Sequence, residues 1–143
     1  MTVRQGRTED LPALLFMERA CFSHPFTEAA VRSHLTEGWG YALLAEEAGE
    51  PCGYLLGSLI AGEGEVFRVA TLPAFRRKGV AEALLSALLS VCEDCFLEVR
   101  RGNLPARGLY EKLGFAPMGE RQNYYTDPVE DAVLYKRQAS PEK

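Results

Sequence analysis

A strand, a basic turn and a helix follow one another directly in residues 66–85. The segment up to Thr71 is rich in β-branched and aromatic residues, which favour a strand. Pro73 ends this strand because proline has no N–H to give to a ladder. Beyond the turn, leucines recur at the helical period, which predicts a helix over residues 79–92. A basic turn that contains glycine therefore lies at a helix N-terminus, where free N–H groups and the helix dipole favour an anion.

The two common phosphate loops, the Walker loop and the dinucleotide fingerprint, do not fit this turn. It reads R-R-K-G-V-A and resembles the pyrophosphate loop of the GNAT acetyltransferases, approximately [QR]-x-x-G-x-[GA]. Arg76, Gly79 and Ala81 fill the three fixed places. The resemblance implies that backbone amides of the turn hold the pyrophosphate of acetyl-CoA. The alternative is an ordinary basic turn that caps a core helix.

A second stretch, residues 97–115, reads L-E-V-R-R-G-N-L-P-A-R-G-L-Y-E-K-L-G-F. It resembles the GNAT segment L-x-V-x-x-x-N-x-x-A-x-x-L-Y-x-x-x-G-F. The matching residues are Asn103, Ala106, Leu109, Tyr110, Gly114 and Phe115. The motifs H-P-F-T, L-E-V-R, R-x-N-Y-Y and E-D-A narrow the resemblance to the RimI-type ribosomal-protein-alanine N-acetyltransferases. Two positions depart from that pattern: Gln122 stands where a basic residue is expected, and Phe26 where tryptophan is common.

The expected fold is α/β, the GNAT fold, with a mixed, mostly antiparallel central sheet and helices on both faces. The resemblance places one N-acetyltransferase domain over residues 1–143. Alternation and turn residues predict strands at 2–7, 41–46, 52–60, 63–71, 96–100, 118–123 and 132–137. Helices are expected from Asp10 or Thr8, from a Thr27 cap to residue 35, and at 79–92 and 105–113. The first four strands should form an antiparallel meander, and the strand after the 79–92 helix should pair in parallel.

Glu98 is the candidate base, because it is an acidic residue in the middle of an apolar strand. A substrate ammonium must lose a proton before it can attack a thioester, and this carboxylate can take the proton through a water. Tyr110 can donate a proton to the leaving thiolate, and the resemblance implies these same two roles. The alternatives are a Glu98 that simply pairs with a basic neighbour such as Arg100 and a tyrosine that belongs to the core.

The expected acetyl-CoA site combines the end of the strand, the basic turn and one asparagine. N–H groups of residues 69–71 can stabilise the oxyanion, and the asparagine either contacts the pantetheine arm or caps the last helix. This set is Val69, Ala70, Thr71, Arg76, Arg77, Lys78, Gly79, Val80, Ala81, Glu82 and Asn103.

A peptide N-terminus is expected to meet Tyr124 and Tyr125, which could instead be edge-strand aromatics. Asp127, Glu130 and Asp131 form a local acidic group that could favour a basic peptide or be merely a solvated loop. The resemblance implies a small-subunit ribosomal protein with an exposed N-terminal alanine as acceptor. Two other functions compete: acetylation of lysine side chains or small-molecule amines, and acyl-CoA binding without catalysis.

Composition and charge exclude several other classes of function. The formal net charge is −4, which argues against a nucleic-acid partner. No apolar run reaches about 18 residues and the N-terminus lacks the apolar stretch of a signal peptide, so a cytoplasmic protein without membrane contact is expected. The four cysteines lack zinc spacing, and no metal is expected. Cys92 and Cys95 should be reduced, because the intervening Glu93 and Asp94 would raise the pKa of both thiols. His24 and His34 neighbour no obvious nucleophile, which argues against a hydrolase.

Overall fold

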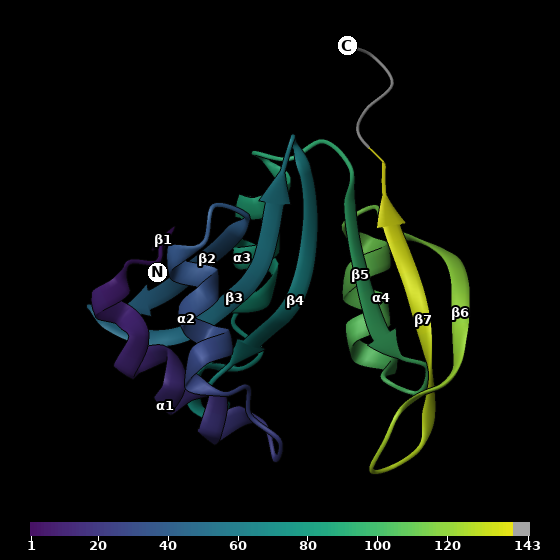
Figure 1. The fold of residues 1–143 in the computed structure, drawn as a ribbon, viewed down its shortest axis with the longest axis horizontal. Helices are drawn as coiled ribbons and strands as arrows, with labels where there is room; N and C mark the ends of the chain where they lie inside the picture. Colours follow the sequence, from purple (N-terminus) through teal and green to yellow (C-terminus); the bar gives the residue numbers. More distant parts are fainter. Residues whose placement is uncertain (139–143) are drawn as a thin grey trace.

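A seven-stranded sheet in the order β1-β2-β3-β4-β5-β7-β6 forms the centre of the computed structural model, which describes residues 1–138 (Figure 1). Along the chain, the strands are β1 Thr2–Gln5, β2 Gly40–Glu47, β3 Glu50–Ile60, β4 Glu63–Thr71, β5 Cys95–Arg100, β6 Ala116–Tyr125 and β7 Glu130–Arg137. The helices are α1 Leu11–Cys21, α2 Glu28–Thr36, α3 Val80–Leu89 and α4 Leu104–Lys112, with short 3-10 turns η1 Thr8–Asp10 and η2 Pro73–Phe75.

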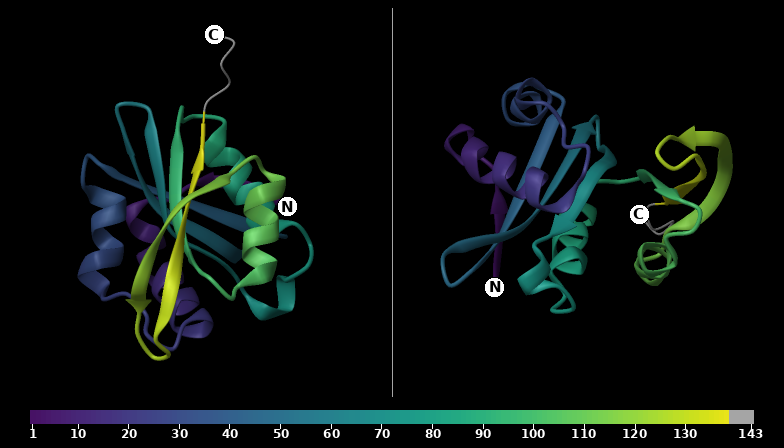
Figure 2. Two further views of the ribbon diagram at one scale, coloured as in Figure 1. Left: turned by 90° about the vertical axis from the view of Figure 1, so that its right-hand side faces the viewer. Right: turned by 90° about the horizontal axis from the view of Figure 1, so that it is seen from below.

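Helices cover both faces of this sheet, as the sequence predicts. In Figure 2, α1 and α2 lie on one side of the strands and α3 and α4 on the other. Each side has its own apolar cluster: α1 and α2 pack Leu14, Met17 and Val31 against the sheet, whereas α3 packs Leu84 and Leu88. Burial of this apolar area is the main favourable term in folding. The α/β architecture of the GNAT type is confirmed.

The sheet divides between β4 and β5. Strands β1 to β4 form the expected antiparallel meander. The β4–β5 pair is parallel, also as expected, but only Gly64–Val66 pairs with Cys95–Leu97. Past this point the two strands diverge (Figure 1). A β-bulge at Phe67, where the β3–β4 register shifts, bends β4 at the same level. The C-terminal halves of both strands therefore face an opening in the middle of the sheet.

Most predicted boundaries agree with the structure to within a few residues. β4 has the predicted bounds, and Thr27 caps α2 by accepting a hydrogen bond from the N–H of Ala30. Asp10, one of the two predicted caps of the first helix, is the N-cap residue of α1, but its side chain makes no capping bond to that helix. The Asp10 carboxylate instead accepts bonds from Arg4 and from the N–H of Arg7. Helix α3 ends at Leu89, three residues early. Of the expected polar tail, residues 139–143 lie outside the described residues.

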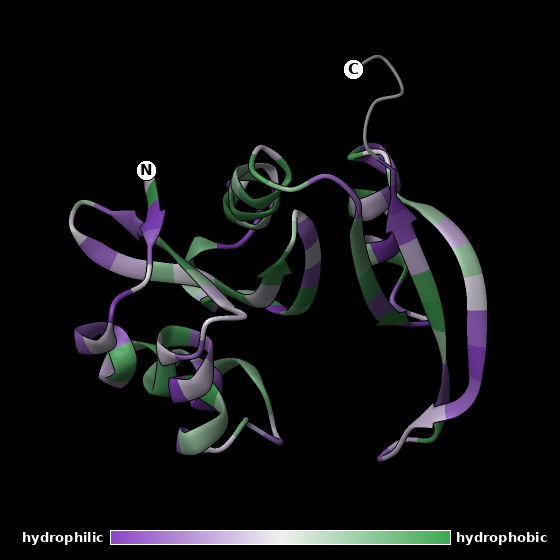
Figure 3. Cartoon of the chain, turned by 45° about the horizontal axis from the view of Figure 1, so that its top comes forward, coloured by the Kyte–Doolittle hydropathy of each residue, from purple (hydrophilic) through white to green (hydrophobic). Residues whose placement is uncertain are grey.

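The edge strand β6 is exposed along almost its whole length. Figure 3 shows long hydrophilic stretches on it, in contrast to the apolar α3. Charged residues such as Glu120 and Arg121 protect an open sheet edge against pairing with another chain. No helix within residues 1–138 is long and apolar enough to span a membrane.

Candidate active site

Two adjoining pockets lie at the opening between β4 and β5. The first, here the β4–β5 pocket, has a volume of about 440 Å³. Its walls include Val69 of β4, Glu98 of β5 and Tyr110 of α4. The second, here the α3 pocket, is lined by Thr71, by residues of the basic turn and by the first turn of α3. Cys21, Phe22 and Val69 line both, so the pockets meet at the end of α1 and at the middle of β4.

Main-chain groups of β4 point into this opening at alternate residues. The N–H of Leu72 donates to the carbonyl of Cys52 on β3, so Leu72 and Ala70 direct their backbone groups toward β3. Backbone groups alternate in direction along a strand, and those of Val69 and Thr71 therefore point away from β3, toward the opening. The carbonyl of Thr71 accepts a bond from Nε of Arg76, with a distance of 3.0 Å. Val69 thus presents an N–H where the two pockets meet.

Gly79 is the N-cap of α3 and adopts φ = 79°. This left-handed conformation suits glycine, and a Cβ added here would meet nothing within 4 Å. No side chain among the described residues caps α3, so its first N–H groups stay available to an anion in the α3 pocket. Of the predicted acetyl-CoA residues, this pocket brings together Val69, Ala70, Thr71, Arg76, Arg77, Gly79, Val80, Ala81 and Glu82. Lys78 lies outside the wall, with its ammonium 5.8 Å from the centre of the Phe75 ring.

Glu98 stands on β5 between the buried Leu97 and Val99, on the opposite face of the strand. Its side chain is 26% exposed, and its carboxylate pairs with Nε of Arg121 at 2.7 Å. Arg100, the basic residue that the sequence suggested as partner, pairs instead with Glu130. Glu98 therefore does pair with a basic residue, but with a different one. Arg121 reaches Glu98 from β6, across the intervening strand β7. The carboxylate is thus held in a fixed direction while it still lines the β4–β5 pocket.

Tyr110 projects from α4 into the same pocket and is 8% exposed. Burial raises the pKa of its phenol to about 12, so the group is protonated at neutral pH. Its ring packs edge-on against Phe115. Asn103 also lines this pocket, and its side-chain oxygen accepts a bond from the N–H of Ala106 at 3.3 Å. The asparagine is therefore the cap of α4, one of its two expected roles.

The two tyrosines at the end of β6 form a third, smaller hollow beside Glu98, here the outer pocket. Their rings meet edge-on with centres 5.1 Å apart. The pKa of Tyr124 is raised, chiefly by the hydrogen bond between its phenol and the Glu98 carboxylate. Burial raises the pKa of Tyr125 to about 12, and the Arg100 guanidinium lies 4.5 Å from the centre of its ring. Tyr125 lines both the outer and the β4–β5 pocket.

The predicted acidic group is not a patch of free negative charge. Glu130 pairs with Arg100 and accepts a bond from the N–H of Gly102. Asp131 accepts a bond from the N–H of Asn123. Asp127 pairs with the ring of His24 at 2.8 Å. All three carboxylates therefore hold neighbouring segments together.

A family model described as the acetyltransferase (GNAT) family matches residues 11–115. The ribosomal protein bS18-alanine N-acetyltransferase of Escherichia coli K12 is 32% identical over 140 residues, which cover 93% of this chain and 94% of that protein. An N-alpha-acetyltransferase of Sulfurisphaera tokodaii is 31% identical over a region that covers 92% of this chain and 89% of that protein. The crystal structure of the Escherichia coli ribosomal-protein-S18-alanine N-acetyltransferase aligns with a TM-score of 0.89 at 31% identity, covering 97% and 94%.

The chain belongs to the GNAT acetyltransferase family. The predicted membership, fold and class of enzyme are confirmed: it is an N-acetyltransferase that takes its acetyl group from acetyl-CoA.

One polar group of this GNAT enzyme was missed by the sequence analysis. Glu18 of α1 is fully buried. Its carboxylate accepts hydrogen bonds from the hydroxyl of Tyr54 on β3 and from the N–H of Phe26, and pairs with Arg68 of β4. The available signal was its helical spacing, because it lies four residues after Leu14 and three before Cys21, on the apolar stripe of α1. A carboxylate at such a position needs a buried partner.

The cysteines of the acetyltransferase are free thiols. Burial, more than the neighbouring acidic residues, raises the pKa of Cys92 and brings that of Cys95 to about 12. The expectation of reduced cysteines therefore holds, with a different main cause. Among residues 1–138, no group of three or more His, Cys, Asp and Glu side chains is arranged to bind a metal ion.

Proposed function

We propose that this enzyme acetylates protein α-amino groups, and that its natural acceptor is the N-terminal alanine of a small-subunit ribosomal protein. The names of the relatives from Escherichia coli support this acceptor. The observation that carries the proposal is the meeting of Glu98, Tyr110 and the Val69 backbone in one pocket, which opens into the α3 pocket. An acceptor that is assembled into ribosomes would place the reaction in the cytoplasm.

Acetyl-CoA binds with its pyrophosphate at the N-terminus of α3. The N–H groups of Gly79, Val80 and Ala81 supply donors there, and Arg76 and Arg77 add positive charge. From this end of the α3 pocket, the pantetheine arm runs along residues 69–71 of β4 toward Asn103. Val69 lines both pockets, so a thioester at the end of the arm lies beside its N–H.

The reaction begins with removal of a proton from the substrate ammonium. An α-ammonium has a pKa of about 7.7–8.0, so much of it is charged at neutral pH. The Glu98 carboxylate, held in place by Arg121, takes this proton directly or through a water. The neutral amine then attacks the thioester carbonyl, and a C–N bond forms. The Val69 N–H faces the oxygen on which negative charge develops.

Collapse of the tetrahedral intermediate breaks the C–S bond and releases a thiolate. The Tyr110 phenol, protonated at neutral pH, donates its proton to that sulfur. After the attack the nitrogen still carries one proton more than the amide product. Transfer of that proton to the Tyr110 oxygen restores the phenol. The reaction therefore yields the amide, the thiol and one proton, which Glu98 passes to solvent.

A peptide N-terminus reaches Glu98 through the outer pocket, along the wall that Tyr124 and Tyr125 form. These rings form a wall beside the side chain of the first residue, so that a small residue such as alanine fits and a large one does not. The proposal is tested by steady-state kinetics on peptides that differ only in their first residue. We expect kcat/KM to be highest for alanine or another small residue and to fall for leucine and tryptophan. Equal values across the series would contradict this role of the tyrosines.

A further inference from the structure

The loop of residues 22–27, between α1 and α2, forms one wall of the site although it has no regular secondary structure. Phe22 and His24 line the β4–β5 pocket, and Phe26 lines the outer pocket. A loop of this kind keeps its shape only where other groups bind its backbone and side chains. The groups that hold it therefore decide the shape of the acceptor side of the enzyme.

Arg68 of β4 reaches into this loop. Its guanidinium lies between two aromatic rings, 3.8 Å from the centre of the Phe22 ring and 3.9 Å from that of the Phe26 ring. Its Nη2 also donates a hydrogen bond to the carbonyl of His24, at 3.2 Å. The first, third and fifth residues of the loop thus contact one planar cation, an arrangement that a lysine ammonium would not reproduce.

Glu18 fixes the other edge of that cation. Its Oε1 pairs with Nη1 of Arg68 at 3.0 Å and accepts the N–H of Phe26 at 2.7 Å. Glu18 is fully buried and the Arg68 side chain is 17% exposed. A buried ion pair of this kind is often no more stabilising than apolar residues of similar volume. Its clear structural effect here is to fix the position of one loop.

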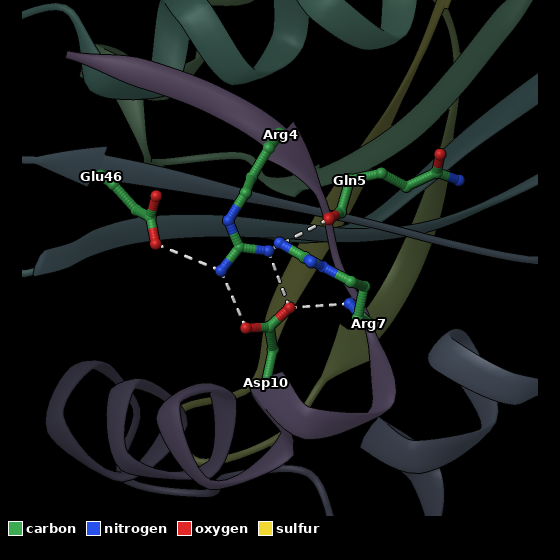
Figure 4. Close-up of polar contacts among 5 residues, drawn as sticks. All are labelled: Arg4, Gln5, Arg7, Asp10 and Glu46. Carbon is green, nitrogen blue, oxygen red and sulfur yellow. Dashed lines mark hydrogen bonds and ion pairs between the residues drawn. The ribbon is translucent and has the colours of Figure 1, made fainter. Parts of the chain in front are cut away.

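A similar arginine–carboxylate cluster lies elsewhere in the molecule. Arg4 donates to both oxygens of Asp10 and to Glu46 (Figure 4). It joins β1 to η1 and β2, and none of its three residues lines the β4–β5, α3 or outer pocket. The two clusters have related chemistry, but only the one at Arg68 borders the acceptor side.

We propose that Arg68 is a positioning residue for the acceptor, which acts with Glu18 by holding residues 22–26 against the β4–β5 and outer pockets. The role in peptide binding rests on the function proposed above. Arg68 does not itself take part in proton transfer. Its loss lets the loop move away from the peptide, while the backbone donors of the α3 pocket stay in place. The effect therefore falls on the KM for the acceptor, with little change in acetyl-CoA affinity.

The test uses the double variant Arg68→Met with Glu18→Gln, which leaves no unpaired charge in the core. We expect its KM for an alanine-initiated peptide to rise between about tenfold and a hundredfold, the range that misplacement of a substrate by about 1 Å can produce. The kcat at saturating peptide should stay within about threefold, and acetyl-CoA affinity by calorimetry within about twofold of the wild type. The single variant Arg68→Lys keeps the charge and an intact Glu18. Its KM for the peptide should rise less than that of the double variant.

The matched control is Arg4→Met with Asp10→Asn, which should lower the melting temperature without raising the KM for peptide. An unchanged peptide KM in the folded Arg68 variant, or an equal rise of that KM in the Arg4 control, would overturn the proposal. Hydrogen exchange provides a readout that needs no substrate. The Phe26 amide, bonded to Glu18, should lose protection in the Arg68 variant and keep it in the Arg4 variant. If wild-type enzyme acetylates no peptide N-terminus, the proposed function fails, and unchanged Phe26 protection would separately overturn the positioning role.

Discussion

The α3 pocket and the β4–β5 pocket adjoin each other but are built in different ways. The α3 pocket takes most of its wall from one continuous segment, residues 69–82, and its candidate donors are main-chain N–H groups. The β4–β5 pocket gathers side chains from five separate parts of the chain, between Cys21 and Asp127. Main-chain donors are fixed by the strand and helix that carry them, whereas convergent side chains depend on their partners. The donor side should therefore tolerate side-chain changes that the acceptor side does not.

The largest expected effect comes from removal of the base. Glu98→Gln keeps the size of the side chain but cannot accept the amine proton, so kcat should fall by about 10²–10⁴-fold. The loss should shrink as the pH rises past about 8, where the α-amine loses its proton unaided. Measurement of kcat between pH 6.5 and 9.5 checks both points.

Arg121→Gln is the control for that substitution, because it removes the ionic partner and leaves the carboxylate. It should cost far less activity than Glu98→Gln at every pH. Near-wild-type turnover of Glu98→Gln at neutral pH would show that another group takes the proton.

Tyr110→Phe should also lower kcat within the range of about 10²–10⁴-fold, toward its lower end. A thiolate, from a thiol with a pKa of about 8.5, is already a fair leaving group. The phenol pKa of about 12 lies above the ordinary value, so Tyr110 stays protonated through pH 10 and should cause no alkaline loss of activity in that range. Acetyl-CoA affinity should not change. Full turnover of Tyr110→Phe would show that Tyr110 is only a core residue and donates no proton in the reaction.

Gly79→Asp should weaken acetyl-CoA binding by about tenfold or more, because it places a negative charge at the proposed pyrophosphate site. Gly79→Ala is the control, since it adds the same Cβ at φ = 79° without the charge. Aspartate adopts this left-handed conformation more readily than alanine, so backbone strain does not account for weaker binding by the aspartate variant. Calorimetry gives both affinities. Equal affinities for the two variants would show that the pyrophosphate does not bind at this turn.

This contrast also explains what the sequence could reveal. The strand, turn and N-terminus of α3 lie in one short segment, and their backbone geometry follows from local residue types, as at Gly79 and Pro73. Alternation along β5 likewise placed Glu98 opposite the buried Leu97 and Val99. Most strand positions followed in the same way, whereas the fold class was implied by the resemblance of the motifs to the GNAT family.

Partners that are distant in the chain could not be predicted. The sequence favoured Arg100 for Glu98, but β6 brings Arg121 to it across β7. The β6–β7 register shifts between Arg121 and Tyr125, so counting residues along the strand does not place this arginine. Glu18 and Arg68 are separated by 50 residues, and nothing in the local pattern of either segment indicates the other.

The smallest expected effect concerns the hydrogen bond between His24 and Asp127, which joins the 22–27 loop to the β6–β7 turn. Both side chains are largely exposed, and such pairs contribute about 0.2–1 kcal/mol. Asp127→Asn should therefore raise the KM for peptide by no more than about fivefold and leave acetyl-CoA affinity unchanged. A larger change in KM would mean that this pair, rather than Arg68, holds the loop.

The position of the acetyl group on a peptide tests the account most directly. Two peptides with the same sequence, beginning Ala-Arg and containing one internal lysine, are incubated with enzyme and acetyl-CoA, one free and one blocked at its α-amine. Mass spectrometry should find acetyl on the α-amine of the free peptide and almost none on the blocked one. Preferred acetylation of the lysine side chain in either peptide would contradict the N-terminal function and favour a lysine or small-amine acetyltransferase.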